Sequence, residues 1–139
     1  MVLRGGLQVR LTFQGDRLHT VNLPDVPHPE FDAAALSALL AELGTYPLAL
    51  DDAPPFHRIV WERMRNIPAG SALTYRELAE EIGNPRAVRA VGQACATNRL
   101  LLIVPCHRVL ASNGLGGFRL GLPWKQRLLE LETEFTSLR

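Results

Sequence analysis

The residues with the clearest chemical potential are Cys106 and His107, which stand side by side directly after Pro105. A cysteine thiolate is a strong nucleophile, but its pKa of about 8.5 must be lowered by a cation, a base or a helix N-terminus. Neighbouring residues of an extended chain point to opposite sides, so we expect His107 to act on Cys106 through a bridging water. The pair predicts nucleophilic chemistry at the sulfur.

An imidazole that serves as a base needs a partner that orients it, and a carboxylate is the usual choice. Glu130 and Glu132, near the C-terminus, are the candidates. The cysteines and the four histidines lack metal-ligand spacing, so no metal site and no cofactor is expected. Cys95 is interpreted as a small buried hydrophobic residue.

The elements around this pair must hold it rigidly. Residues 100–104 form a continuous apolar run that predicts a buried strand ended by Pro105. Upstream, Thr74 and Glu77 predict a capping box for a helix over 75–82, and a Gly-Asn-Pro turn leads into a second helix over about 86–97. Two helices joined in this way predict a helix-turn-helix. Further helices are expected over 56–66 and 124–131.

The first third of the chain predicts a different architecture. Alternating apolar and polar residues over 7–13 and 17–23 indicate a β-hairpin, and apolar residues at helical spacing predict a helix over 31–43. Residues 47–55 are interpreted as a linker. We therefore expect an α+β protein with a reduced N-terminal α/β subdomain, 1–53, of scaffolding role, and a mostly helical domain, 54–139, with a winged-helix-like helix-turn-helix and a PCHRV active-site loop.

Charge separates the same two regions. Residues 1–53 carry 3 Arg against 7 acidic residues, whereas residues 54–128 carry 11 Lys and Arg against 4 Glu, and residues 129–139 carry net −2. A net charge of +7 in the middle segment suits a polyanion such as DNA, although a merely solvated basic face is the alternative. No apolar run approaches the roughly 20 residues of a membrane helix and no secretion signal is visible, so we expect a cytoplasmic, nucleoid-associated protein without membrane partners.

Motifs in the basic region resemble the O6-alkylguanine-DNA alkyltransferase family, also called methylated-DNA-protein-cysteine methyltransferases. The resemblance covers roughly residues 54–132, in order and spacing. The segments that carry it are Pro105-Cys106-His107-Arg108-Val109, Phe56 to Trp61, Ile67-Pro68-Ala69-Gly70, Tyr75-Arg76-Glu77-Leu78-Ala79, Gly83-Asn84-Pro85, Arg89-Ala90-Val91-Gly92, Asn98, and Lys125 through Glu132.

The resemblance implies direct reversal of DNA damage, in which an alkyl group moves irreversibly from O6 of guanine to Cys106, once per molecule and without cofactor. It implies that His107 is the base acting through water, that Glu132 orients His107, and that Asn98 supports the cysteine segment by hydrogen bonds. A solvated helix-end carboxylate is the alternative for Glu132. Arg108 is interpreted as a structural salt-bridge residue.

The implied partner is double-stranded DNA containing O6-alkylguanine, with the damaged nucleotide flipped into a pocket. By resemblance Tyr75 helps to rotate the nucleotide and Arg89 fills the space it leaves. The second helix of the helix-turn-helix would lie in the minor groove, where small residues permit a close approach. Further implied DNA contacts are Arg76, Asn84, Ala87, Ala90 and Ser112.

The implied substrate pocket lies between the cysteine segment, the second helix and the glycine-rich loop. Its expected residues are Cys95, Val109, Gly117, Phe118 and Arg119, with backbone from Cys106 and Gly114 onward. Two departures from the family pattern concern its width: Phe118 stands where tyrosine is common, and the glycine loop is one residue short.

Three other functions compete with transfer. A non-catalytic alkyltransferase-like protein would flip and hold alkylguanine and flag it for other repair machinery, but such relatives usually lack the cysteine. A Cys-His hydrolase needs an oxyanion hole that the sequence does not supply. A helix-turn-helix regulator needs a dimer interface and a sequence-reading helix. We expect a monomer with no obligate protein partner.

Overall fold

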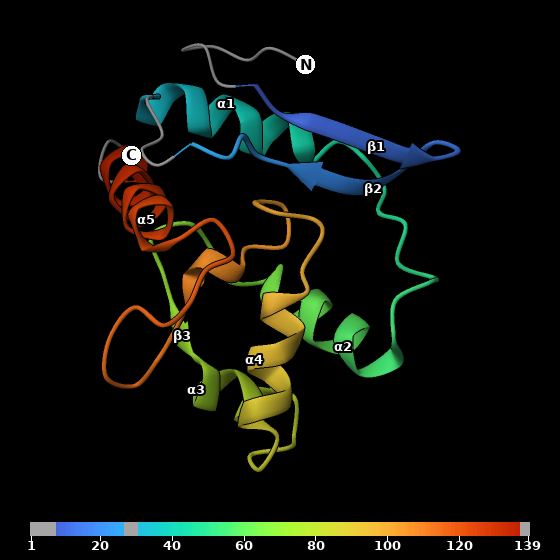
Figure 1. The fold of residues 1–139 in the computed structure, drawn as a ribbon, viewed down its shortest axis with the longest axis vertical. Helices are drawn as coiled ribbons and strands as arrows, with labels where there is room; N and C mark the ends of the chain where they lie inside the picture. Colours follow the sequence, from blue (N-terminus) through green and yellow to red (C-terminus); the bar gives the residue numbers. More distant parts are fainter. Residues whose placement is uncertain (1–7, 27–30, 137–139) are drawn as a thin grey trace.

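The N-terminal part forms a layer of one hairpin and one helix. The computed structural model describes residues 8–26 and 31–136. Strands β1 (Arg10–Gln14) and β2 (Arg17–Asn22) pair in antiparallel register, and helix α1 (Ala33–Leu43) lies beside them (Figure 1). Asp32 caps α1 by accepting a hydrogen bond from the amide of Ala35. The predicted hairpin and helix are confirmed within the described residues; Leu7 lies outside them.

The predicted helix-turn-helix is confirmed at the opposite end of the molecule, below the hairpin in Figure 1. Helix α3 (Tyr75–Glu81) begins with the expected capping box, in which Thr74 and Glu77 exchange hydrogen bonds of 2.8 and 3.0 Å. Helix α4 (Val88–Ala96) follows and packs on α3 and on α2 (Pro55–Met64). Residues 86 and 87 precede α4 rather than form its first turn.

A short parallel pair of strands connects the helix-turn-helix to the cysteine segment. Strand β3 (Leu73–Thr74), immediately before Tyr75, pairs with β4 (Val109–Leu110), immediately after the 3-10 turn η2 (Cys106–Arg108). The PCHRV segment is therefore a 3-10 turn and a strand, not a loop. This pairing places the first residue of α3 close to the segment that carries Cys106. Beyond β4, an isolated bridge joins Ala111 to Gly114 at the start of the glycine loop.

Residues 100–104 do not form the predicted strand. Only Leu100 makes a single bridge, to Val21, and the residues after it form tight turns. Leu102 adopts a left-handed backbone with φ of 73°, and the amide of Ile103 bonds to the carbonyl of Leu101 at 2.9 Å. Burial of this run was predicted correctly, but an apolar run does not by itself distinguish a strand from a buried turn.

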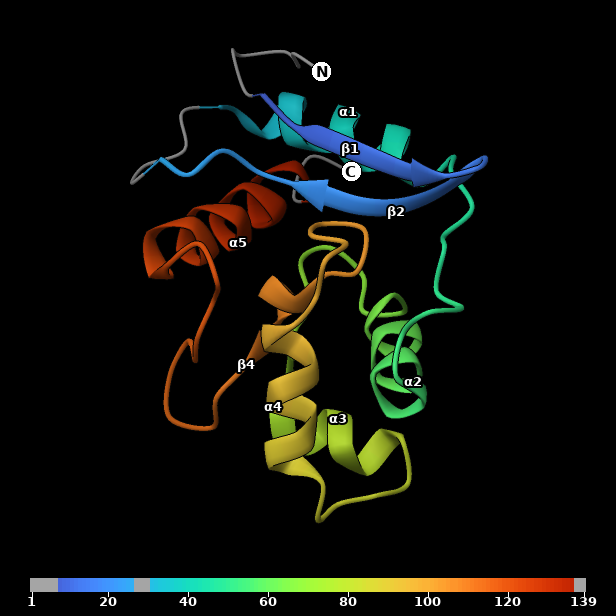
Figure 2. The same ribbon diagram turned by 45° about the vertical axis from the view of Figure 1, so that its right-hand side comes forward.

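Helix α5 (Leu122–Thr136) is longer than predicted and lies between the two parts of the molecule (Figure 2). It packs against α1, and Trp124, Leu128 and Leu131 are buried on its inner face. No helix within the described ranges is long and apolar enough to cross a membrane.

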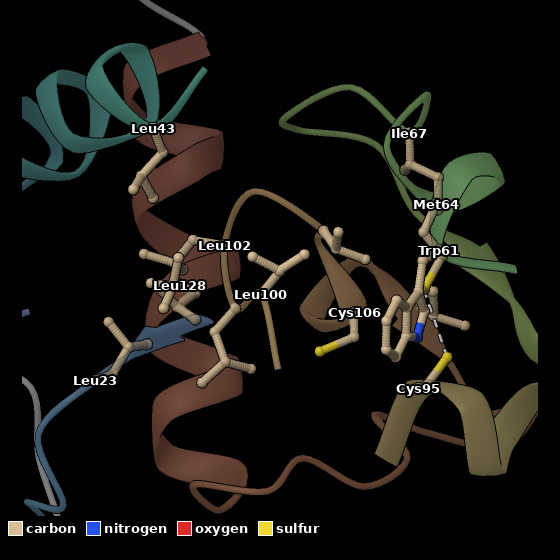
Figure 3. Close-up of a cluster of buried hydrophobic side chains, with 14 of the residues drawn as sticks. Leu23, Leu43, Trp61, Met64, Ile67, Cys95, Leu100, Leu102, Cys106 and Leu128 are labelled. Atoms are coloured by element: carbon tan, nitrogen blue, oxygen red, sulfur yellow. Dashed lines mark hydrogen bonds between the residues drawn. The ribbon is translucent and has the colours of Figure 1, made fainter. Parts of the chain in front are cut away.

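One continuous core joins the regions before and after residue 53. Leu23 and Leu43 pack with Leu100 and Leu128, and the same cluster continues to Trp61 (Figure 3). The segment 47–55, interpreted as a linker, is packed: it holds buried Leu48, Ala49, Leu50 and Ala53, and Leu48 bridges to β2. Its prolines and acidic residues resemble a linker in composition, but its apolar residues all face the core.

Candidate active site

Cys106 is presented by two consecutive tight turns. Pro105, with φ of −83° and ψ of 68°, forms a turn of the inverse γ type, closed by a 2.8 Å hydrogen bond from the amide of Cys106 to the carbonyl of Val104. Proline suits this place because its ring fixes φ near the required value. The cysteine then begins the η2 turn, where the residue is 6% exposed. Figure 3 shows it between Leu100 and Trp61.

Asn98 holds the turns that lead to the cysteine. Its side-chain amide donates to the carbonyl of Val104 at 2.7 Å, and its side-chain oxygen accepts from the amide of Leu100 at 2.9 Å. The side chain is buried, so both hydrogen bonds replace contacts with water that are no longer available. The side chain of Asn98 thus pairs with backbone groups of Leu100 and Val104 that would bond to a neighbouring strand if residues 100–104 were in a sheet.

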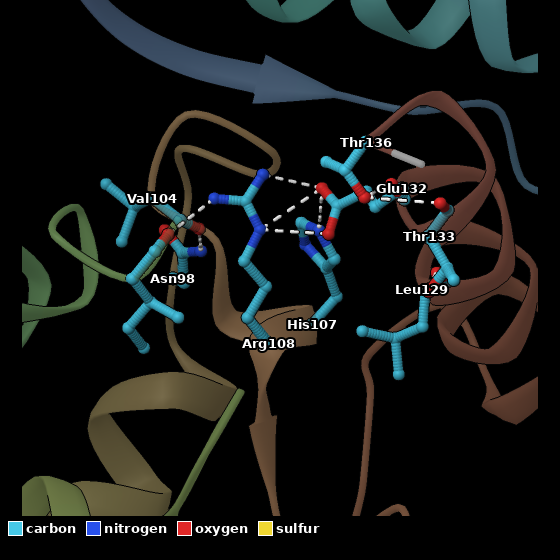
Figure 4. A network of polar contacts seen from close by, with 9 residues as sticks. Asn98, Val104, His107, Arg108, Leu129, Glu132, Thr133 and Thr136 are labelled. Carbon is cyan, nitrogen blue, oxygen red and sulfur yellow. Dashed lines mark hydrogen bonds and ion pairs between the residues drawn. The ribbon is translucent and has the colours of Figure 1, made fainter. Parts of the chain in front are cut away.

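A buried network joins His107, Arg108 and Glu132 (Figure 4). Nε2 of His107 lies 2.8 Å from Oε2 of Glu132. The guanidinium of Arg108 reaches the same carboxylate with its Nε at 2.9 Å from Oε1 and its Nη2 at 2.5 Å from Oε2, and its Nη1 donates to the carbonyl of Ile67 at 2.7 Å. Arg108 therefore connects the site to Ile67, just after α2. Glu130, the other candidate carboxylate, is not in the network: it pairs with Arg127 on the outer surface.

The protonation states follow from these contacts. Burial raises the pKa of Glu132, but hydrogen bonds from His107 and Arg108 outweigh it and hold that pKa below its usual value. Burial lowers the pKa of His107 despite the neighbouring carboxylate. A neutral imidazole beside an ionised carboxylate carries its proton on Nε2, which leaves Nδ1 as an acceptor. Nδ1 of His107 is buried and has no hydrogen-bond partner among the described residues.

The thiol of Cys106 is subject to opposing influences. Burial raises its pKa, whereas the Asn98 amide and the cations of Lys125 and Arg119 act to lower it. For Cys95, burial and the proximity of Cys106 raise the pKa to about 12, so Cys95 is an inert thiol near neutral pH. Its Sγ lies 3.5 Å from Sδ of Met64.

A cavity of about 360 Å³ opens beside Cys106. Of the expected pocket residues, Cys95, Gly117, Phe118 and Arg119 line it, together with Tyr75. Val109 does not: it is fully buried, and its carbonyl accepts a hydrogen bond from Lys125. The remaining lining residues, which sequence reasoning did not place there, are Gly92, Ala96, Asn98 and Leu101.

Lys125 is the principal residue that sequence reasoning did not assign to the site. Its side chain is fully buried, and its Nζ donates to the carbonyls of Val109 at 2.6 Å and Gly117 at 3.1 Å. The same nitrogen lies 6.0 Å from the centre of the Tyr75 ring. One signal was available: Lys125 and Glu132 occupy the same face of α5 as Leu128, and charged residues on a core-facing stripe need partners.

The glycine loop closes against Tyr75. Gly116 has φ of 75°, and a Cβ at this position would lie 3.1 Å from the tyrosine ring and hydroxyl and 3.1 Å from the amide of Ala111. Glycine is needed here both for the left-handed backbone and for this close approach. At Gly92, by contrast, a Cβ would meet nothing within 4 Å, so no packed neighbour explains that glycine, which faces the cavity.

The residues expected to contact DNA lie apart from the buried network. Arg76, Asn84, Arg89 and Ala90 are exposed on or between α3 and α4, and Ala87 is half-buried just before α4. Both helices form the end of the molecule farthest from the hairpin (Figures 1 and 2). Ser112 is exposed after β4. Of the DNA-contact residues, the structure brings Tyr75 into the cavity with Cys106. The other six do not line it.

Comparisons with known proteins agree on one family. Residues 55–134 match the model described as "6-O-methylguanine DNA methyltransferase, DNA binding domain". A probable methylated-DNA–protein-cysteine methyltransferase of Acanthamoeba polyphaga mimivirus is 49% identical over 83 residues, which are 60% of this chain and 56% of that protein. A methylated-DNA–protein-cysteine methyltransferase of Methanopyrus kandleri is 45% identical over 100 residues, covering 68% of this chain and 75% of the relative.

The fold comparison extends over nearly the whole chain. Mycobacterium tuberculosis OGT, solved in complex with DNA, superposes with a TM-score of 0.75 at 33% identity, covering 91% of this chain and 86% of that one. The chain spans little more than half the length of the viral relative. The α+β architecture, hairpin layer included, is thus shared with that structure.

Proposed function

This chain belongs to the 6-O-methylguanine DNA methyltransferase family, and we propose that it repairs DNA by moving an alkyl group from O6 of guanine to Sγ of Cys106. One observation carries the proposal most directly. Glu132 fixes the proton of His107 on Nε2, so that the buried Nδ1 is left as a base next to a cysteine at the edge of a cavity. A water between Nδ1 and the thiol completes the relay.

In the proposed reaction the thiol proton passes through the water to Nδ1 of His107. The sulfur attacks the alkyl carbon, and an S–C bond forms as the O6–C bond breaks with its electron pair staying on guanine. The departing guanine anion then takes up one proton and the imidazolium of His107 gives one up, so both groups end neutral and the protons balance. The imidazolium formed in between is stabilised by the ionised Glu132 at 2.8 Å. A thioether is not reversed by any group in the site, so each molecule acts once and requires no cofactor.

The cavity supports base flipping as the route to the lesion. Its volume of about 360 Å³ falls in the range of small-molecule sites, roughly 300–1,000 Å³, and a flipped nucleobase is of that size class. One wall is α4, where Gly92 and Ala96 present little side chain. Tyr75 and Phe118 provide aromatic surfaces against which a base can stack.

Helices α3 and α4 are proposed as the DNA-binding surface. The charge of the segment from 54 to 128 favours duplex DNA, and small residues on α4 allow a close approach to a minor groove. Arg89 is proposed to occupy the space left by the flipped nucleotide. The proposed neighbours of the backbone are Arg76, Asn84, Ala87, Ala90 and Ser112.

We propose a monomer that works on chromosomal DNA in the cytoplasm, in association with the nucleoid. The division into residues 1–53, a structural subdomain, and 54–139, the alkyltransferase domain, is part of the same proposal. It is supported by the family match beginning at residue 55 and by the change of charge sign at that point.

Intact-mass analysis tests the transfer. The chain is incubated with a duplex that contains one O6-methylguanine, and the product is digested and mapped. We expect a gain of one methyl on the Cys106 peptide, no gain in Cys106→Ser, and a normal gain at Cys106 in the matched control Cys95→Ser. Tight binding of the damaged duplex without any change of mass would contradict transfer and favour a non-catalytic lesion-binding protein.

A further inference from the structure

We propose that Arg99 is a positioning residue for alkyl transfer: it anchors the turn that leads to Cys106 to the N-terminal hairpin and to the segment before α2. The inference rests on the proposed function, because it concerns the same cysteine. It assigns to residues 1–53 a part in the reaction that a passive scaffold does not have.

The side chain of Arg99 joins three separate segments. Its Nε donates to the carbonyl of His19 in β2 at 3.1 Å, and its Nη2 donates to the carbonyl of Ala49 at 2.9 Å and to the carboxylate of Asp52 at 2.7 Å. The guanidinium carbon lies 5.2 Å from the centre of the Trp61 ring on α2. A planar group with several donors can serve all of these partners at once, which a lysine ammonium cannot do with the same geometry.

The backbone of Arg99 is fixed to the hairpin as well. Its carbonyl accepts a 2.9 Å hydrogen bond from the amide of Val21, and the next residue, Leu100, bridges to the same strand. On its other side stands Asn98, whose side chain organises the turn. Arg99 is thus held by contacts on both its main chain and its side chain, between two fully buried neighbours.

The turn beyond Arg99 needs such anchoring because it contains an unfavourable conformation. Leu102 has a φ of 73° in a three-residue turn, an arrangement that non-glycine residues rarely adopt. Residues in such conformations persist only where the surrounding structure determines them from several directions. Burial of Leu102 fixes the turn from the core side, and the Arg99 contacts fix its beginning.

Displacement of this turn would be transmitted directly to the sulfur. Asn98 bonds to the carbonyl of Val104, the amide of Val104 bonds to the carbonyl of Leu100, and the amide of Cys106 bonds to the carbonyl of Val104. These hydrogen bonds connect the residues on both sides of the turn, from Asn98 to the nucleophile. A misplacement of about 1 Å in a reacting group can lower a rate by about 100-fold.

Single-turnover kinetics separate this role from a structural one. The rate of methyl transfer at saturating damaged duplex and the duplex concentration that gives half that rate are measured for the wild type, Arg99→Ala and Arg99→Lys. Arg58→Ala is the matched control, because Arg58 is also an arginine paired with carboxylates, those of Asp51 and Glu62, but lies on the exposed face of α2. We expect a fall of about tenfold or more in the saturating rate of Arg99→Ala, with the half-saturating concentration changed less than about twofold. Arg99→Lys is expected to fall between Arg99→Ala and the wild type, and Arg58→Ala to match the wild type.

A second measurement reports on the turn without DNA. Loss of the anchor should speed hydrogen exchange at the amides of Val104 and Cys106, and should change the rate at which iodoacetamide labels the mapped Cys106 peptide.

If Arg99→Ala is folded and keeps the wild-type saturating rate, or if rate and affinity fall together with unchanged exchange, the positioning role is overturned. If Arg99→Ala does not fold, Asp52→Asn is measured in the same way, and a wild-type rate and exchange in that variant overturn the role. A wild type that transfers no methyl group contradicts the proposed function instead, so the two failures are distinguishable.

Discussion

The thiol of Cys106 is kept protonated at rest and is activated by groups from three segments. Burial raises its pKa, and the groups that lower it come from the end of α4, from the glycine loop and from α5. Removal of the proton is therefore part of the reaction rather than a condition that precedes it. Among those groups Lys125 has a double role, because it is a nearby cation and also binds the carbonyls of Val109 and Gly117.

Lys125→Met tests whether the charge of Lys125, rather than its packing, supports methyl transfer. Methionine keeps the length and the apolar stem of lysine, so a buried charge is lost with little loss of packing. The Cys106 thiol loses one cation, and the glycine loop loses its tether. We expect methyl transfer to fall by about tenfold or more, with the pKa of Cys106 raised further. Single-turnover rates and titration of thiolate absorbance check this.

Arg127→Met is the control for that variant, because it removes a cation from the outer face of the same helix, where Arg127 pairs with Glu130. It should leave both the rate and the thiol titration unchanged. A Lys125→Met protein that transfers methyl at the wild-type rate would show that the lysine acts only in packing.

At the scale of elements, α4 has two faces: Gly92, Cys95 and Ala96 line the cavity, whereas Arg89 is on the exposed face proposed to contact DNA. Arg89 is exposed on α4 and does not line the cavity. Its proposed task is needed only when a base must leave a duplex. Because Arg89 is outside the cavity lining, extrusion of the base can be tested apart from transfer.

Arg89→Ala is expected to slow repair of O6-methylguanine paired in a duplex while leaving the reaction with the free base O6-benzylguanine close to the wild-type rate. Unstacking the base costs a few kcal/mol. Without the Arg89 side chain to occupy the vacated space, α4 no longer offsets that cost. The measurement is the ratio of the two single-turnover rates, with Arg63→Ala on α2 as a control. An equal loss on both substrates would contradict a role of Arg89 in extrusion.

Elements with local signals were predicted well, and those fixed by distant partners were not. The capping residues Thr74 and Glu77 lie three residues apart and mark the start of α3 whatever surrounds them. The apolar run from Leu100 to Val104 carries no such signal, and its conformation depends on the Asn98 side chain and on β2. The length of α5 was underestimated: it extends beyond 124–131 at both ends, and Pro123 in its first turn is a start signal that the prediction did not use.

The features of the site that local sequence pattern did not predict are pairings between residues far apart in the chain. The contact of His107 with Glu132 spans 25 residues, and local pattern alone left Glu130 equally eligible; the family resemblance favoured Glu132. Lys125 was seen only as part of that resemblance, because a single lysine in an amphipathic helix looks like a solvated residue. Its burial becomes evident only when the helix is placed against the glycine loop.

For the molecule as a whole, the buried His107 links stability to pH. Its pKa is lowered in the folded state, so below about 6.5 the unfolded chain binds a proton that the folded protein does not. The free energy of unfolding rises with pH wherever the unfolded state binds more protons. We therefore expect stability to decrease as the pH falls from 7.5 to 5.5, with a slope of at most about 1.4 kcal/mol per pH unit from this group.

Urea unfolding at a series of pH values measures that slope. His107→Gln keeps a donor toward Glu132 but cannot titrate, so its slope in this window should be smaller than that of the wild type. Arg58→Ala, which removes an exposed cation, should retain the wild-type slope. Identical slopes for His107→Gln and the wild type would mean that the pH dependence arises elsewhere.

Helix α5 imposes a constraint on how this chain can vary. Lys125 and Glu132 are seven residues apart, two turns of a helix, and each must reach a different partner from the same face. A single inserted or deleted residue between them would rotate one relative to the other by about 100°. The interval is therefore fixed in length although its outward residues are free to change. If this chain is recombined with a related sequence, a crossover between Lys125 and Glu132 must keep these two residues seven positions apart.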